Sequence, residues 1–248
     1  MNIGMYQAAA ALSANARWQE VISENLASAS VPGFKRTEMS FTSFEVGLMP
    51  KEAGRDLKYT LPRAATATVF TPGELQSTGV PTHAAIDGPG FFEVTLPTGE
   101  SGYTRDGSFS LDAAGMLVSK EGHPVASDTG SITFDKASRG EVAISRDGTV
   151  SKGSEGRGRL KVVTFADPSK LVAAGGGFWK VPDASVKITD DPSPSIRGGF
   201  IEGSNASPVG EMVSMINAMR LFEANQKVIQ AHDERTGRAI SELGGTTS

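Results

Sequence analysis

Residues 207–229 read SPVGEMVSMINAMRLFEANQKVI, and this stretch decides how the C-terminal end of the chain folds. Apolar residues recur in it at spacings of three and four, which is the period of one helix face: Met212, Ile216, Met219, Phe222 and Ile229, with the polar Gln226 in the same stripe. Ser207 suits an N-cap, and Pro208 suits the first helical position because its missing N–H costs nothing there. Gly244 and Gly245 mark the end. The sequence predicts a long amphipathic helix.

The N-terminal end carries a second stripe of helical period. Residues 1–29 contain no proline, and no glycine after Gly4. The stripe consists of Met5, Ala8, Leu12, Trp18, Ile22 and Leu26, with Asn15 inside it. Val31-Pro32-Gly33 then ends the helix, because proline restricts the residue before it and glycine supplies the turn. Both ends of the chain are therefore predicted to be helical.

Between the helices the pattern changes to strands and turns. From Ile86 to Glu202, short β-rich runs such as 91–96, 160–165 and 178–181 alternate with Asp-Gly or Glu-Gly pairs at 87, 106, 121 and 147. These pairs predict hairpins, because glycine accepts a positive φ and aspartate bonds the turn backbone. Residues 37–85 have no clear period and predict only short strands or extended connections.

The predicted fold class is α+β. It has four segments: an N-terminal helix and turn (1–36), an extended connection (37–85), an all-β middle domain (86–202) and a C-terminal helix (203–248). The two terminal helices are expected to form a coiled-coil layer. An isolated helix of about 26 residues is marginal in water, so each stripe needs a partner. Spacing leaves open whether that partner is the other end of the same chain or another copy, whose register Asn15 and Gln226 could fix.

Composition excludes several classes of function. The chain has 248 residues, no cysteine and a net charge of −4, so it offers no disulfide, no thiolate and no field that would gather nucleic acid. No run of about 18 apolar residues predicts membrane insertion, and the first 16 residues lack the basic start of a cleaved secretory signal. By themselves these features favour the cytoplasm.

No constellation of residues predicts catalysis. Asp128-Thr129-Gly130 has the letters of an aspartic-protease triplet, but no second copy exists and a turn explains it better. The three histidines, His83, His123 and His232, are too far apart in sequence for a metal motif, and Gly175-Gly176-Gly177 lacks the spacing of a phosphate loop. We expect no enzyme, no metal and no cofactor.

Three blocks of sequence resemble one family. Residues 25–36 (NLASASVPGFKR), the pair 87–94 and 102–109, and residues 201–229 resemble, in this order, the N-terminal signature, the β domain and the C-terminal signature of flagellar rod and hook proteins. The length and the short stretch between Phe34 and Gly90 are most similar to the proximal-rod member, with the distal-rod member as the alternative. Gly210 and Ala206 depart from the family pattern near the C-terminal helix.

The resemblance implies a structural subunit that polymerises through its terminal helices. It implies a shaft that transmits torque, encloses the export channel and supports motility, with other copies, neighbouring rod proteins and the flagellar type III export apparatus as partners. It also implies a place in the basal-body rod of the periplasm, reached without a cleaved signal. The assembly residues that it implies are Met5, Leu12, Trp18, Ile22, Asn25, Leu26, Gly33 and Phe34 at the N-terminal end, and Ser204, Asn205, Met212, Ile216, Met219, Phe222 and Ile229 at the C-terminal end. A secreted β-rich binding module with a helical stalk is the competing hypothesis.

Overall fold

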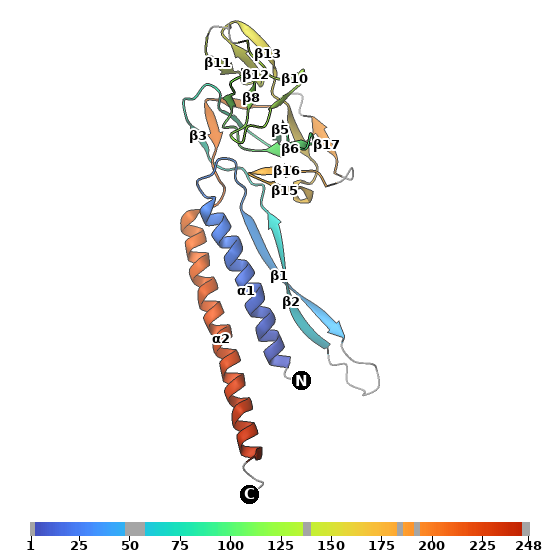
Figure 1. Ribbon diagram of the computed structural model, residues 1–248, viewed down its shortest axis with the longest axis vertical. Helices are drawn as coiled ribbons and strands as arrows, with labels where there is room; N and C mark the ends of the chain where they lie inside the picture. Colours follow the sequence, from blue (N-terminus) through green and yellow to red (C-terminus); the bar gives the residue numbers. More distant parts are fainter. Residues whose placement is uncertain (1–2, 48–57, 136–139, 183–185, 191–193, 245–248) are drawn as a thin grey trace. The chain divides into compact units, whose positions relative to one another are not determined.

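The computed structural model describes residues 3–47, 58–135, 140–182, 186–190 and 194–244. It is an α+β fold with one long helix at each end of the chain, α1 (Ile3–Ala27) and α2 (Pro208–Gly244), shown in Figure 1. The strands are β1 (Thr37–Gly47), β2 (Lys58–Thr68), β3 (Leu75–Ser77), β4 (Ala84–Ile86), β5 (Phe91–Thr95), β6 (Ser101–Thr104), β7 (Ser110–Leu111), β8 (Leu117–Val118), β9 (Ala126–Ser127), β10 (Gly130–Ser131), β11 (Val142–Ile144), β12 (Thr149–Lys152), β13 (Glu155–Arg159), β14 (Val162–Phe165), β15 (Val172–Gly175), β16 (Phe178–Lys180), β17 (Ile188–Asp190), β18 (Ile196–Gly198) and β19 (Phe200–Glu202). A short 3-10 helix, η2 (Pro168–Lys170), precedes β15.

The chain divides into two compact units whose boundaries differ from the predicted segments. Unit 1 comprises residues 1–27, 37–67 and 207–248, and unit 2 comprises residues 28–36 and 68–206. The turn after the first helix thus belongs to the β unit, and the expected connection 37–85 is shared between the two units. The division follows contacts made far along the chain, which sequence composition does not display.

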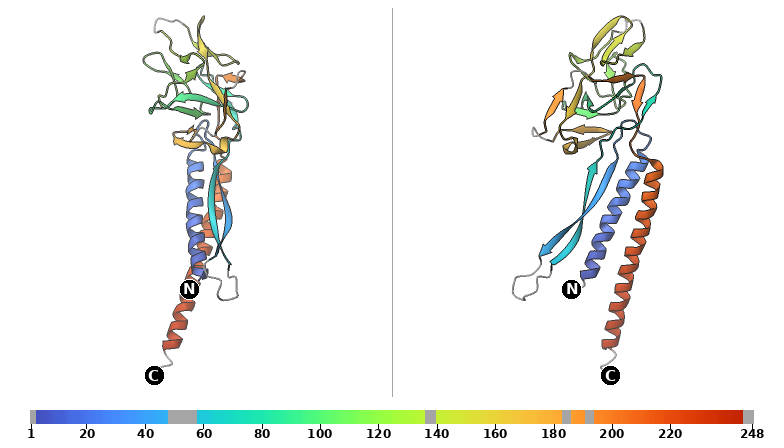
Figure 2. Two further views of the ribbon diagram at one scale, coloured as in Figure 1. Left: turned by 90° about the vertical axis from the view of Figure 1, so that its right-hand side faces the viewer. Right: turned by 180° about the vertical axis from the view of Figure 1, so that it is seen from behind.

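Unit 1 consists of the two helices and a two-stranded sheet. The helices run in opposite directions side by side, and α1 also contacts β1 (Figures 1 and 2). The predicted start of α2 is confirmed, since the Ser207 hydroxyl accepts the Gly210 N–H at 3.4 Å. The sheet of β1 and β2 is more regular than predicted, with 11 residues in each strand. Pro62 is tolerated in β2 because each strand of a two-stranded sheet has a free edge.

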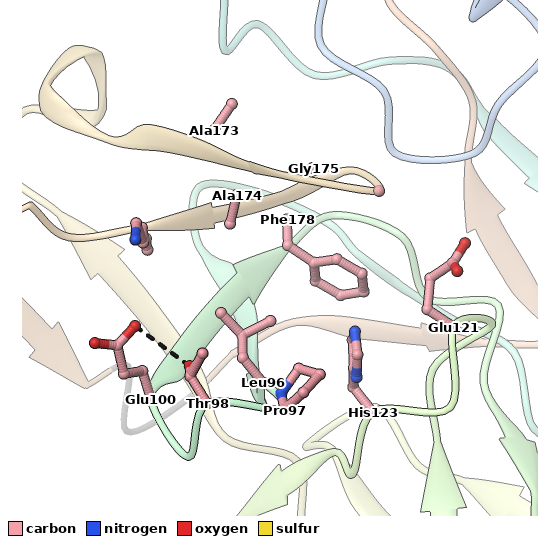
Figure 3. Close-up of a pocket in the computed structure, with 12 residues that line it drawn as sticks. Leu96, Pro97, Thr98, Glu100, Glu121, His123, Ala173, Ala174, Gly175 and Phe178 are labelled. Atoms are coloured by element: carbon pink, nitrogen blue, oxygen red, sulfur yellow. Dashed lines mark hydrogen bonds between the residues drawn. The ribbon is translucent and has the colours of Figure 1, made fainter.

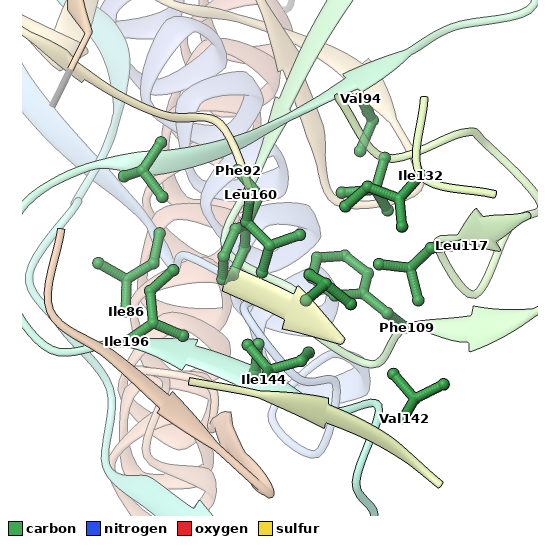
Figure 4. Packing of buried hydrophobic residues seen from close by; sticks show 14 of the residues in the cluster. Ile86, Phe92, Val94, Phe109, Leu117, Ile132, Val142, Ile144, Leu160 and Ile196 are labelled. Carbon is green, nitrogen blue, oxygen red and sulfur yellow. The ribbon is translucent and has the colours of Figure 1, made fainter. Parts of the chain in front are cut away.

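Unit 2 is built on a six-stranded sheet with the order β15-β16-β6-β5-β14-β17, in which every neighbouring pair is antiparallel. The β-rich runs at 91–96, 160–165 and 178–181 are confirmed as β5, β14 and β16. The main core, shown in Figure 4, gathers buried side chains from eight strands and the loops between them, including Ile86, Phe92, Val94, Phe109, Leu117, Ile132, Ile144, Leu160 and Ile196. A second, aromatic cluster is formed by Phe91, Tyr103, Val163, Leu171 and Trp179.

The predicted hairpins are confirmed only in part. Asp147-Gly148 joins the paired strands β11 and β12, and Glu121-Gly122 closes a turn spanned by the Val118–Pro124 bridge. The hairpins predicted at 87 and 106 are wrong, because the strands on either side of these pairs do not pair with each other. Gly107 serves a different purpose: a Cβ there would lie 1.6 Å from the Ala84 carbonyl oxygen, so glycine permits close approach of two backbones.

Candidate assembly surface

The two terminal helices pack on each other within one chain. Ala8, Asn15 and Ile22 of α1 are buried, and Ala218 of α2 is fully buried. The Asn15 side-chain amide donates to the Ala218 carbonyl at 3.0 Å, which fixes the register of the pair. The two facing apolar stripes therefore bury each other. For this part of each helix, the partner is the other end of the same chain.

The predicted stripe of α2 does not lie wholly against α1. Phe222 and Ile229 are half-buried, whereas Met212, Ile216, Met219 and Gln226 are exposed. Most side chains that α2 does shield follow spacings of three and four along another line: Glu211, Met215, Ala218, Phe222, Asn225, Ile229 and His232. Ser214 is half-buried as well. The first turns of α2 carry apolar residues on two sides, so periodicity alone could not tell the two sides apart.

The second apolar side of α2 forms an exposed surface, which we name the outer patch. It consists of residues that are each between 47% and 68% exposed: Val209, Met212, Val213, Ile216 and Met219. At 100° per residue these side chains occupy a stripe about 120° wide, directed away from the side that bears Ala218. Monomeric proteins rarely expose such a contiguous stripe without a binding role. The outer patch is the strongest candidate for contact with another molecule.

The remaining residues predicted on α1 contact unit 1 itself. Trp18 meets Phe41 of β1 edge to face at 6.0 Å between ring centroids. Ile22 is buried, Leu12 and Leu26 are half-buried, and the side chain of Met5 lies outside the described residues. Both polar groups of the buried Asn25 amide bond the backbone of Thr37 at 2.9 Å, donating to its carbonyl and accepting its N–H. Asn25 thereby fixes the start of β1.

The predicted residues near the helix ends hold three chain segments of unit 2 together. The Gly33 N–H donates to the Glu202 carbonyl at 2.7 Å, and a Cβ on Gly33 would lie 2.3 Å from the Asp106 nitrogen. The Asn205 side chain accepts the Arg36 N–H at 2.7 Å and donates to the Val69 carbonyl at 2.7 Å. These contacts are within the chain.

Phe34 and Ser204 take part in the same junction. The Phe34 carbonyl accepts the Asn205 N–H at 3.4 Å, and the Ser204 hydroxyl accepts the Ala206 N–H at 3.1 Å. Both residues are half-buried. Whether either of them also contacts a neighbouring molecule stays a prediction.

A buried charge cluster, which the sequence analysis missed, lies in this junction of unit 2. The Glu202 carboxylate, 1% exposed, accepts from the Lys35 ammonium, from the Gly73 N–H at 2.8 Å and from the Arg105 guanidinium at 3.1 Å. Arg105 also donates to the Gly88 carbonyl at 2.9 Å. Burial lowers the pKa of both Lys35 and Arg105, and the charge of Glu202 opposes the shift. The three charges come from residues up to 167 positions apart, so no spacing in the sequence signals them.

An open pocket of about 600 Å³ lies in unit 2 beside the β15–β16 turn (Figure 3). Leu96, Pro97, Ala174 and Phe178 line it, and the His123 ring stands edge to face on Phe178 at 5.0 Å. Glu100 bonds Thr98 at 3.4 Å on one rim. None of these groups is a nucleophile activated by a base. Among the described residues no cluster of His, Asp and Glu could hold a metal ion, and no helix is long and apolar enough to cross a membrane.

Known proteins match the chain at both ends and in the middle. Family models match residues 5–35 ("Flagella basal body rod protein"), residues 85–152 ("Flagellar hook protein FlgE/F/G D1 domain") and residues 197–242 ("Flagellar basal body rod FlgEFG protein C-terminal"). The basal-body rod protein FlgF of Salmonella typhimurium is 33% identical over 253 residues, covering 96% of this chain and 97% of the relative. FlgG of Buchnera aphidicola subsp. Schizaphis graminum is 34% identical over 238 residues, covering 86% and 89%. This chain belongs to the flagellar basal-body rod protein family.

Flagellar basal-body rod proteins are structural subunits, which assemble with other rod components in the basal body. In this rod protein the junction draws on all three matched regions: Lys35 lies in the first, Arg105 in the second, and Glu202 with Asn205 in the third. The outer patch lies in the third region. The matched regions thus contain both the residues that build the junction and the apolar surface that stays exposed among the described residues.

Proposed function

We propose that this chain is a proximal-rod subunit that joins other copies and neighbouring rod proteins through its terminal helices. The polymer transmits torque from the motor to the hook, encloses the export channel and so supports motility. The subunit reaches the periplasmic rod through the flagellar type III export apparatus without a cleaved signal. No step of this function requires catalysis, a cofactor or nucleic acid.

The observation that supports this proposal is the outer patch. Five apolar side chains on the first turns of α2 are exposed among the described residues, although the opposite side of the same turns packs on α1 through Ala218. Burying large apolar side chains contributes about 1.5–3 kcal/mol each, which is enough to favour association of copies held at high local concentration. If the outer patch of one copy contacts a different surface of the next copy, the contact is heterologous, and repeating it without closure generates a helical polymer.

The competing hypothesis, a secreted binding module with a helical stalk, predicts the same helix pair. It does not explain why one exposed side of α2 is apolar. A stalk whose helices pack only on each other would have polar side chains on the whole exposed side of α2. The outer patch instead exposes five apolar side chains. The membership in the rod family also favours the rod. Relatives named FlgF and FlgG match the chain at similar identity, so identity does not separate the two subtypes. The proposal of a proximal-rod subunit therefore depends on the chain length and on the short stretch between Phe34 and Gly90.

The first prediction tests both the function and the subtype. The full chain is expressed in two strains of its own species, one lacking the native FlgF and one lacking FlgG, and swimming is measured. We expect the wild-type chain to restore motility only in the strain without FlgF. Ile216→Glu should abolish motility and incorporation into basal bodies, because it places a charge in the apolar contact, while changing the free energy of unfolding by no more than about 0.5 kcal/mol at an exposed site.

Asn217→Glu is the matched control for this test. It adds the same charge to the neighbouring exposed residue beside the outer patch, and should leave motility intact. Restoration in neither strain by the wild-type chain would contradict the rod function. Restoration only in the strain without FlgG would transfer the subunit to the distal rod.

A further inference from the structure

The two terminal helices differ in length, and their register shows which part of α2 is left without a partner. Asn15 bonds Ala218. Twelve residues lead from Asn15 to Ile3, and 26 lead in the same direction from Ala218 to Gly244. At 1.5 Å per residue, α2 therefore extends about 20 Å beyond the first residue of α1. The right-hand view in Figure 2 shows this projecting end, which we name the α2 extension, residues 233–244.

The α2 extension continues the face that packs on α1. The shielded residues of α2 follow a heptad repeat, which includes Phe222, Asn225, Ile229 and His232. The next positions of this heptad repeat are Thr236 and Ala239, and Ile240 lies beside them on the helix. All described side chains from 233 to 242 are exposed, and Ile240 is 66% exposed. An interface that exists in the first two thirds of α2 thus continues onto a segment that nothing in the described chain covers.

A helix of this kind is not expected to be stable alone. Isolated helices shorter than about 12–15 residues are marginal in water, and Gly237 costs roughly 1 kcal/mol relative to alanine. The side chains of the α2 extension are mainly polar, so it cannot form a core of its own. It needs a surface that covers Ala239 and Ile240.

The outer patch has the dimensions and chemistry of that surface. It covers residues 209–219, about 16 Å of helix, against about 18 Å for the α2 extension. It also ends abruptly, because the same side of α2 carries Arg220, Glu223 and Lys227 in the following turns, all exposed. The apolar patch is thus a bounded site for a short apolar segment.

We propose that the α2 extension of one copy packs on the outer patch of the next copy. This inference rests on the proposed function and specifies the contact between copies within it. α1 is a poorer occupant of the patch, because one of its sides is taken by α2 and another by Phe41 of β1. The contact joins two different surfaces of the chain, so each added copy leaves one of these surfaces free for the next copy.

Cysteine cross-linking tests this contact without background, because the chain contains no cysteine. The full-length double variant Ile216→Cys/Ile240→Cys replaces the native chain, and isolated basal bodies are oxidised and analysed on denaturing gels. We expect a ladder at multiples of the 25.9 kDa chain mass, which collapses on reduction. The matched control Asn217→Cys/Ile240→Cys should give no ladder, since residue 217 points to the side of the patch.

Several outcomes would overturn the inference while leaving the rod function intact. These are basal bodies that contain the Ile216→Cys/Ile240→Cys chain but give no ladder, dimers from Ile240→Cys alone, or a product whose mass shows a different protein. If the cysteine variant fails to assemble, a pair of substitutions with opposite charges tests the contact instead. Ile216→Glu and Ile240→Lys should each lose incorporation, and the two together should regain it. If the double variant stays excluded while Asn217→Glu assembles, the contact is not between these two residues.

Discussion

At the scale of single residues, Glu202 is the centre of the buried charge cluster of unit 2. Its carboxylate is the acceptor for two buried cations, Lys35 and Arg105, and its carbonyl accepts the N–H of Gly33. Breaking a buried ion pair by removing one partner is costly, because the remaining charge stays buried without compensation. An exposed pair such as Arg197–Asp87, 2.7 Å apart, is worth far less because water solvates both groups.

This contrast gives a prediction for Glu202→Gln. The variant keeps the shape of the side chain and removes its charge, so urea unfolding should show a loss of about 3–5 kcal/mol. The control Asp87→Asn removes a carboxylate from the exposed pair and should cost no more than about 1 kcal/mol. Equal losses in the two variants would show that the buried cluster contributes no more than a surface pair.

The pH dependence of the same variant provides a second readout. Burial lowers the Lys35 pKa in the folded state below its usual 10.5, and the charge of Glu202 limits this shift. A base with a lowered folded pKa binds fewer protons folded than unfolded, so the free energy of unfolding rises with pH between the folded pKa and 10.5. Without the Glu202 charge the folded pKa falls further. Glu202→Gln should therefore lose less stability at alkaline pH than at neutral pH.

At the scale of elements, α1 and α2 show what periodicity can and cannot decide. The pattern predicted both helices and the Ser207 cap, and these are confirmed. The predicted end at Gly244-Gly245 reaches the limit of the described residues and stays a prediction. It did not separate the two apolar sides of α2, because Met212 and Met215 belong to different sides and are only three residues apart. Periodicity placed Asn15 in the buried stripe but could not show its hydrogen bonds. Its side-chain nitrogen donates to Ala218, whereas its side-chain oxygen has no hydrogen-bond partner among the described residues.

Asn15→Leu should separate stability from register. The substitution removes an unsatisfied buried polar atom, so we expect the free energy of unfolding of the isolated protein to rise by about 1 kcal/mol. The bond to Ala218 that fixes the register is lost, so incorporation into basal bodies should fall. Ser13→Leu, at an exposed position of the same helix, is the control, with a change within about 0.5 kcal/mol. A less stable Asn15→Leu protein would show that the amide contributes net stability.

At the scale of the whole molecule, the chain consists of two units with different kinds of core. Unit 2 has a closed core of buried aromatic and branched side chains, whereas unit 1 depends on one helix–helix seam and a two-stranded sheet. Local stability follows the density of buried apolar contacts. The two helices thus share the unit that we expect to be less stable, and among the described residues nothing covers the α2 extension.

Hydrogen exchange on the dilute protein should reproduce this order. We expect the slowest amides in β5 and β8 of the unit 2 core, intermediate protection in the paired part of α1 and α2, and the fastest helical exchange in the α2 extension. In assembled rods the α2 extension should gain protection, while the core strands should change little. Protection of the α2 extension in the dilute protein as strong as that of β5 would contradict this view of unit 1.

The sequence by itself determined the elements that depend on neighbours along the chain. These are the two terminal helices with their period of 3.6, the cap at Ser207, the β-rich middle and the family signature blocks. Such features arise from local sterics, turn chemistry and side-chain period, which a linear pattern displays. The tertiary structure alone decided which side of α2 is covered, that residues 28–36 belong with the β unit, and that Lys35, Arg105 and Glu202 meet. Those outcomes depend on which distant segments bury each other's surface. The free energy of such a contact depends on both segments, so no single stretch of sequence predicts it.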